Sequence, residues 1–161
     1  MLDFRFEMAK SMFFDRARIL TPAREAEKKV LSRFGAYCMR VARNSIKDGD
    51  NLNDHSQEGD PPRNHHTVLG GAGFRGSILF VWDRPSQAVY IGGALLDGAT
   101  ADNPVPGVLE HGGDTVRNRR VIFVAPRPHM GPAFLKTCDK LADWLRDCVT
   151  NEAGHAATYH A

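Results

Sequence analysis

The stretch that decides the fold is residues 120–134, RVIFVAPRPHMGPAF, because its backbone preference changes within a few residues. Residues 120–125 are rich in β-branched and aromatic side chains, which predicts a strand. A continuous apolar run of this kind is typical of a central strand that is buried on both faces. Pro126 and Pro128 end the strand, since proline cannot donate to a β-ladder, and Pro132 suits the first turn of a helix. The stretch therefore predicts a strand that leads directly into a helix.

The C-terminal helix is predicted from about 131 to 149, and an N-terminal helix from about 22 to 47. Thr21 can cap the N-terminal helix, with Pro22 at its first position, where a missing N–H costs nothing. Both segments carry apolar residues at three- and four-residue spacing, which places these residues on one helix face. The predicted buried stripes are Ala26, Val30, Phe34, Tyr37, Val41 and Ser45 in the first helix, and Phe134, Cys138, Leu141, Leu145 and Cys148, beside Trp144, in the last.

A hairpin is predicted upstream of the decisive strand. Residues 78–82 and 88–92 favour extended backbone, and the turn sequence DRPSQ separates them. The order helix, hairpin, strand, helix predicts an α+β fold, in which an antiparallel sheet of about three to four strands packs against two long helices. We expect a single domain over residues 1–161, made of an N-terminal arm or short helix at 1–20, a core at 22–150 and a polar tail at 151–161.

Two long connections, residues 48–73 and 93–119, are rich in glycine and polar residues. Loops beyond about 12–15 residues are usually functional or disordered. The first connection holds too few apolar residues to order itself, so we expect it to order against a neighbouring subunit. We also expect the fold to survive replacement of residues 52–66 by a short linker, because closure entropy grows slowly with loop length.

Composition excludes several classes of protein. Apolar residues make up 42% of the 161 residues and charged residues 25%, which is typical of a globular chain. The net charge of +2 gives no bulk argument for nucleic-acid wrapping. No apolar run approaches the roughly 20 residues of a membrane span, and we expect no signal peptide. The three cysteines lack CxxC spacing, which favours reduced, buried thiols.

Three groups of residues are candidate sites of chemistry. His65 and His66, with His55 and Asp54 nearby, are candidate metal ligands, but adjacent histidines on a loop rarely enclose an ion, and solvated loop residues are the favoured interpretation. Glu110 and His111 form a candidate acid–base pair without a nucleophile in a recognisable turn; a strand end entering a glycine turn is favoured. The glycine-rich residues 70–73 lack the GK[ST] ending of a phosphate loop. We therefore predict no catalytic, metal or cofactor site.

The densest basic cluster is Arg117, Arg119 and Arg120. Such a cluster can contact DNA phosphates. It can equally be a charged strand edge that prevents unwanted pairing with other chains. Both interpretations stay open at the level of the sequence.

A family resemblance emerges from an ordered set of motifs. The sequence GFRGSI at 73–78 is followed by VYIG at 89–92, by LEHGG at 109–113 and by APRPHMGPAF at 125–134. This order resembles the neck, or tail-component, proteins of tailed bacteriophages, over roughly residues 22–150, and the last motif is the most specific. The residues that match the family's pattern are Glu110, Gly112, Pro126, Pro128, Met130, Pro132 and Ala133. The chain departs from the pattern in His129, where the family usually has phenylalanine, and in longer connections at 48–73 and 93–107.

The resemblance implies a structural virion protein that is not an enzyme and needs no cofactor. Proteins of this family form rings, here expected to hold six subunits, between the portal and the tail tube. The implied partners are further copies, the neighbouring head-closure, adaptor or portal, and tail-tube or terminator proteins, and the genomic DNA that would pass through the ring. The implied location is the head–tail junction of a virion made in a bacterial cytoplasm, with no membrane contact.

Two other functions compete with this one. A small nucleic-acid-binding module would use the cluster Arg117, Arg119 and Arg120. A small hydrolase would use His111 or His129. Neither accounts for the two long connections. The proline-rich sequence before the last helix further predicts that Met130 and Phe134 turn inward against the sheet.

Overall fold

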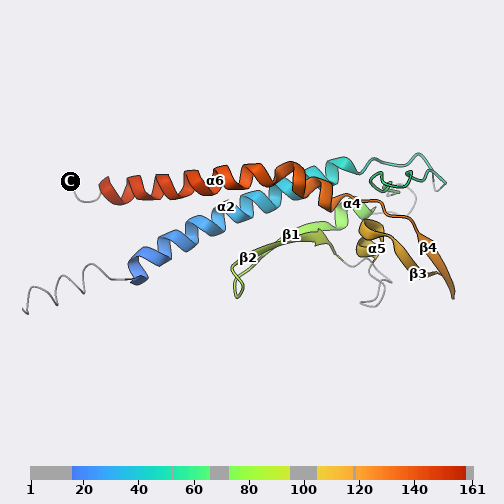
Figure 1. Cartoon of the computed structure of the whole chain (residues 1–161), viewed down its shortest axis with the longest axis horizontal. Coiled ribbons are helices and arrows are strands. Elements are labelled where there is room, and N and C mark those ends of the chain that lie inside the picture. The colour runs from blue at the N-terminus through green and yellow to red at the C-terminus, as the bar shows by residue number, and fades with distance from the viewer. Residues whose placement is uncertain (1–15, 52, 66–72, 95–104, 118, 159–161) are drawn as a thin grey trace, which may run out of the picture.

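A computed structural model of the chain describes residues 16–51, 53–65, 73–94, 105–117 and 119–158 (Figure 1). The proposed N-terminal arm before residue 16, the long connection at 95–104, and His66 with residues 67–72 lie outside these ranges. The elements in chain order are α2 (Arg16–Ser45), α4 (Gly73–Ser77), β1 (Ile78–Asp83), β2 (Ala88–Gly93), α5 (Val105–His111), β3 (Gly113–Arg117), β4 (Arg120–Val124) and α6 (Met130–Thr158).

The α+β class is confirmed, and so are the two long helices. Helices α2 and α6 lie side by side along the molecule (Figure 1). Both are longer than predicted: α2 begins at Arg16, so that Pro22 lies inside it, and α6 runs to Thr158. None of the helices in the described ranges is long and apolar enough to span a membrane.

The core lies where α2 meets both α6 and the first hairpin. Its buried residues include Phe34, Cys38, Ala42 and Ile46 of α2, Ile78 of β1 and Ala133 of α6. The predicted stripe of α2 is therefore displaced, because Cys38, Ala42 and Ile46 are innermost instead of Tyr37, Val41 and Ser45. A helix that is covered from two sides buries its small residues at the closest approach, and its larger residues flank them.

The stripe of α6 is displaced in the same way. Ala133 and Thr137 are buried, whereas Phe134 is 48% exposed. Phe134 contacts the edge of Phe34 on α2, with 6.1 Å between ring centroids, so the prediction that it packs against the sheet was wrong. Met130, in contrast, packs against the core as predicted.

The first hairpin is confirmed and lies on α2. Strands β1 and β2 pair antiparallel from Ile78 with Gly93 to Asp83 with Ala88. A Cβ on Gly35 of α2 would lie 2.7 Å from a methyl of Val89 and 3.0 Å from the Phe80 ring. The glycine inside α2 is therefore the point where the hairpin approaches the helix most closely.

The second hairpin departs from the prediction of one sheet. The four strands that the structure describes form two separate antiparallel pairs, β1–β2 and β3–β4. Strand β4 is not central, since Val121 is 70% and Phe123 is 72% exposed. A continuous apolar run is compatible with burial on two faces, but it does not say whether the covering layers belong to the same chain.

The connection after α2 is folded against its own chain over residues 48–51 and 53–65, contrary to the prediction that it needs a neighbour. Asn64 is 1% exposed, and its backbone N–H donates to Lys47 O at 2.9 Å. Its side-chain amide donates to Asp48 Oδ1 at 2.9 Å and accepts from the backbone N–H of Arg75 at 3.2 Å. The connection has few apolar residues to pack, and the hydrogen bonds of the buried Asn64 amide hold it against the rest of the chain instead.

Candidate functional site

The segments that carry the family motif meet where α5, β4 and α6 converge (Figure 1). Helix α5 ends at His111, and Gly112 follows with a left-handed φ of +73°. A Cβ on Gly112 would lie 2.9 Å from the Pro126 ring and 3.0 Å from Val124 O. Glycine is needed there both for its conformation and for the close contact with Pro126. The predicted strand end before this turn is thus a helix end.

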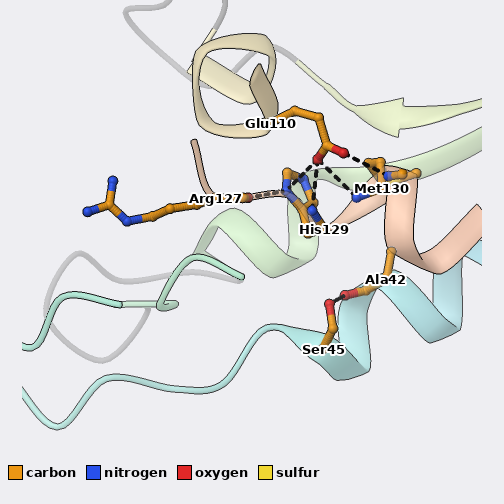
Figure 2. Close-up of polar contacts among 7 residues, drawn as sticks. Ala42, Ser45, Glu110, Arg127, His129 and Met130 are labelled. Atoms are coloured by element: carbon orange, nitrogen blue, oxygen red, sulfur yellow. Dashed lines mark hydrogen bonds and ion pairs between the residues drawn. The ribbon is translucent and has the colours of Figure 1, made fainter. Parts of the chain in front are cut away.

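Glu110 joins this turn to the start of α6 (Figure 2). Its carboxylate accepts hydrogen bonds from the backbone N–H groups of His129 at 2.9 Å, Met130 at 3.0 Å and Gly131 at 2.7 Å. These donors belong to the first turn of α6, where helix N–H groups have no partner within the helix. A carboxylate from a distant part of the chain therefore caps α6 and neutralises the positive end of its dipole. We call this arrangement of Glu110 and residues 129–131 the Glu110 joint.

His129 completes the Glu110 joint. Its side chain is 1% exposed, and its Nδ1 lies 3.0 Å from Glu110 Oε2 and 3.2 Å from Arg127 O (Figure 2). Both neighbours are acceptors, so Nδ1 carries a hydrogen. The ring also meets Phe74 of α4 edge-on, with 5.1 Å between centroids.

The electrostatics of Glu110 favour its charged form. Partial burial acts to raise the pKa of Glu110, but the backbone donors of residues 129–131, together with the His129 imidazole, outweigh it. The net result is a pKa below the ordinary value of 4.5. At neutral pH the carboxylate is therefore ionised and held in place as a structural acceptor.

Arg127 joins the connection after α2, through its residue Ser56, to the start of α6. Its backbone N–H donates to Leu109 O at 2.6 Å, and its guanidinium lies 3.4 Å from Ser56 O. Gly59 N–H donates to Pro126 O at 2.9 Å. Four parts of the chain are thus fixed around the start of α6: α5, β4, the folded connection and α4.

The predicted family residues are mostly brought together here. Glu110, Gly112, Pro126 and Met130 form or flank the Glu110 joint, and Ala133 is buried one turn into α6. Pro128 and Pro132 instead line an adjoining pocket of about 470 Å³. The sequence identified Glu110 but missed its pairing with His129, and the signal available was the histidine at a position where the resemblance expects phenylalanine.

The basic cluster lies elsewhere, at the turn of the β3–β4 hairpin. Arg117 pairs with Arg120 across the hairpin, and Arg119 occupies the turn with φ of 61°. Arg119 and Arg120 are exposed. Figure 1 places this turn at the far end of a hairpin that projects away from the two long helices.

The other candidate constellations do not assemble in the described residues. Asp54 forms an ion pair with Arg63, and the rings of His55 and His65 are 6.3 Å apart. Over the described ranges, no three side chains of metal-binding type lie close enough to share an ion. Cys38 is buried in the core, and burial raises the pKa of its thiol.

Comparison of the chain with protein-family models, with curated proteins and with solved structures found no match.

Proposed function

We propose that the protein is a structural subunit of the bacteriophage head–tail junction, where it forms a ring that joins or completes the tail beneath the portal. The observation that carries the proposal is the Glu110 joint. The motif segments LEHGG and APRPHMGPAF are in direct contact, because the Glu110 carboxylate bonds to backbone N–H groups that lie 19 to 21 residues further along the chain. A resemblance between linear patterns is more specific when its pieces form one structural unit.

The shape of the molecule supports an assembling subunit. The Glu110 joint fixes the base of the β3–β4 hairpin, which extends away from α2 and α6 (Figure 1). An isolated two-stranded hairpin is marginally stable in water, and this one exposes large apolar side chains. Subunits of an assembly complete such elements with surfaces of their neighbours.

The role needs no catalysis and no cofactor from this chain. The partly buried carboxylate of Glu110 caps a helix, and its partners are backbone N–H groups and a buried imidazole. The proposed partners are further copies in a ring of six and the head-closure, adaptor or portal, and tail-tube or terminator proteins on either side. Genomic DNA would pass through the ring, and the protein would reside in the virion after synthesis in the bacterial cytoplasm.

Complementation tests the proposal directly. A phage that lacks this protein should accumulate free heads and free tails, and the wild-type chain supplied in trans should restore joined particles. Averaged images of the restored virion should place the protein between portal and tail tube. Joined, infectious particles formed without the protein would overturn the proposal.

One observation favours a second function, nucleic-acid binding. Arg119 and Arg120 are exposed at the end of a projecting hairpin, where they could reach phosphates without steric hindrance. The isolated protein would then bind DNA with an affinity that falls steeply as salt rises. Replacing Arg119 and Arg120 by glutamate should abolish that binding, and DNA binding that is unaffected by the replacement would contradict this function.

A further inference from the structure

The β3–β4 hairpin carries an exposed apolar face. Its register places Val116 opposite Val121 and Asp114 opposite Phe123, and residues directly opposite share a face of the ribbon. The exposed fractions on this face are 60% for Val116, 70% for Val121 and 72% for Phe123. We call this set the hairpin face. Contiguous exposed apolar side chains on a small projecting element are typical of an interaction surface.

Helix α6 carries a second exposed surface. Ala133 and Thr137 point into the core, so the opposite side of the helix faces outward. Leu135 lies on that side and is 72% exposed. Asp139 and Asp143 follow at four-residue intervals and are also exposed, which places them on the same side of the helix as Leu135. We call Leu135, Asp139 and Asp143 the α6 face.

The two surfaces are complementary in charge. Val116, Val121 and Phe123 share their face of the ribbon with the exposed Asp114 near its base and lead to the basic turn at Arg119, whereas the α6 face begins at Leu135 and continues into the carboxylates of Asp139 and Asp143. Asp143 holds Arg146 at 3.2 Å, but both side chains are well exposed, so this pair is worth little and can exchange. In such a contact the apolar side chains of the hairpin face would meet Leu135, and Arg119 at the turn would meet the aspartates.

The dimensions also agree. A strand rises about 3.3 Å per residue, so Phe123 lies about 10 to 13 Å from the turn that carries Arg119. A helix rises about 1.5 Å per residue, so Leu135 lies about 6 Å from Asp139 and about 12 Å from Asp143. With Phe123 on Leu135, the basic turn therefore reaches the carboxylates.

We propose that the hairpin face of one copy docks on the α6 face of the next copy. The inference rests on the proposed function in that it specifies the contact within the ring. The hairpin projects away from α6 of its own chain, so the contact forms between molecules (Figure 1). The two surfaces differ, which makes the contact head-to-tail, and such contacts close into rings or continue as filaments. The charge match makes a second copy a better occupant than nucleic acid, since phosphates do not cover an apolar face.

A mixing experiment with the full chain tests the contact. One variant carries Val121→Thr and Phe123→Thr, which removes the apolar side chains and keeps β-forming residues in the strand. The other carries Leu135→Lys, which removes the apolar side chain that would contact Phe123 and puts a charge in its place. Each variant alone should stay monomeric in sedimentation velocity at concentrations where the wild type assembles. An equimolar mixture should stop at a one-to-one dimer, because each variant retains one intact surface.

The matched control is Val81→Thr with Tyr90→Thr. These residues pair across the β1–β2 hairpin and are 59% and 58% exposed, so they match the hairpin face in chemistry and exposure. The control should assemble like the wild type. Circular dichroism of every variant establishes that it is folded.

Several outcomes would overturn the contact. These are assembly of either single-surface variant like the wild type, a mixture that remains monomeric, or a control that loses assembly to the same degree. A wild type that stays monomeric at its highest soluble concentration would do so as well. The contact is measured in solution, whereas the head–tail role is measured by complementation, so either can fail while the other holds.

Discussion

At the residue scale, Glu110 is the side chain with the most consequential environment. Its carboxylate accepts three backbone N–H groups at 2.7–3.0 Å, and glutamine could accept with only one oxygen and would place an NH₂ against the remaining donors. Glu110→Gln should therefore lower the free energy of unfolding by about 1–3 kcal/mol. Urea denaturation measures this. Glu27→Gln, at an exposed position of α2, is the control and should change it by less than about 0.5 kcal/mol.

The same residue gives the protein an acid-labile contribution to stability. The pKa of Glu110 is lowered in the folded protein relative to its ordinary value of 4.5. A depressed folded pKa contributes stability that is present above the unfolded value and lost as pH falls through the folded value. The difference in free energy of unfolding between the wild type and Glu110→Gln should thus be constant near neutral pH and shrink below about pH 4.5. A difference that grows on acidification would contradict the assignment of the charged form.

At the element scale, the sequence predicts the two long helices, α2 and α6, but not the short helices α4 and α5, and it misplaces the faces that the long helices bury. Spacing identifies an apolar stripe, yet the stripe is wide, and its innermost line depends on which elements cover it. The first hairpin approaches α2 at Gly35, so that Cys38 and Ala42 become innermost instead of Tyr37 and Val41. The Glu110 joint was hidden for a similar reason, because a contact between residues 19 apart leaves no periodic signal in the chain.

Gly35 provides a test of that packing. Alanine is a better helix former than glycine by about 1 kcal/mol. Its Cβ would, however, lie 2.7 Å from Val89 and 3.0 Å from Phe80, and overpacking costs about 1–3 kcal/mol. Gly35→Ala should therefore destabilise the protein in thermal or urea unfolding. The loss should be smaller in a Val89→Ala background, which removes the closest methyl; identical losses in both backgrounds would place the hairpin elsewhere.

The connection after α2 is an element in its own right, and this reverses the expected effect of replacing it. A linker in place of residues 52–66 removes Asn64, whose buried amide bonds to Asp48 and to the backbone of Arg75. It also removes Ser56 O, the acceptor of the Arg127 guanidinium. We expect this variant to lose about 2–4 kcal/mol of stability, because the hydrogen bonds made by the buried Asn64 amide and by the Arg127 guanidinium are removed together. Unchanged urea denaturation would restore the interpretation that the loop is independent of the fold.

At the scale of the whole molecule, the two long helices and the first hairpin form a core that is complete, while the β3–β4 hairpin is left with its apolar face in water. The sequence could predict a strand there, but it could not distinguish burial within the chain from burial in an assembly. Both environments select the same run of apolar residues, and Val121 and Phe123 are more than two-thirds exposed in the single chain. The free energy of unfolding should therefore depend on the protein concentration.

That dependence is measurable as a melting temperature that rises with protein concentration. A partner that binds only the folded state stabilises it by RT ln(1 + [L]/Kd), which is about 2.7 kcal/mol at a hundredfold excess over Kd. For a chain of this size, 1 kcal/mol corresponds to roughly 2–4 °C. Wild-type Tm should climb by about 5–10 °C from far below Kd to a hundredfold above it. Val121→Thr with Phe123→Thr should melt at one temperature throughout, near that of dilute wild type, because the substituted side chains contact little within their own chain. A wild-type Tm that is independent of concentration, or a variant that shows the same climb, would mean that the hairpin face is not the surface through which copies stabilise one another.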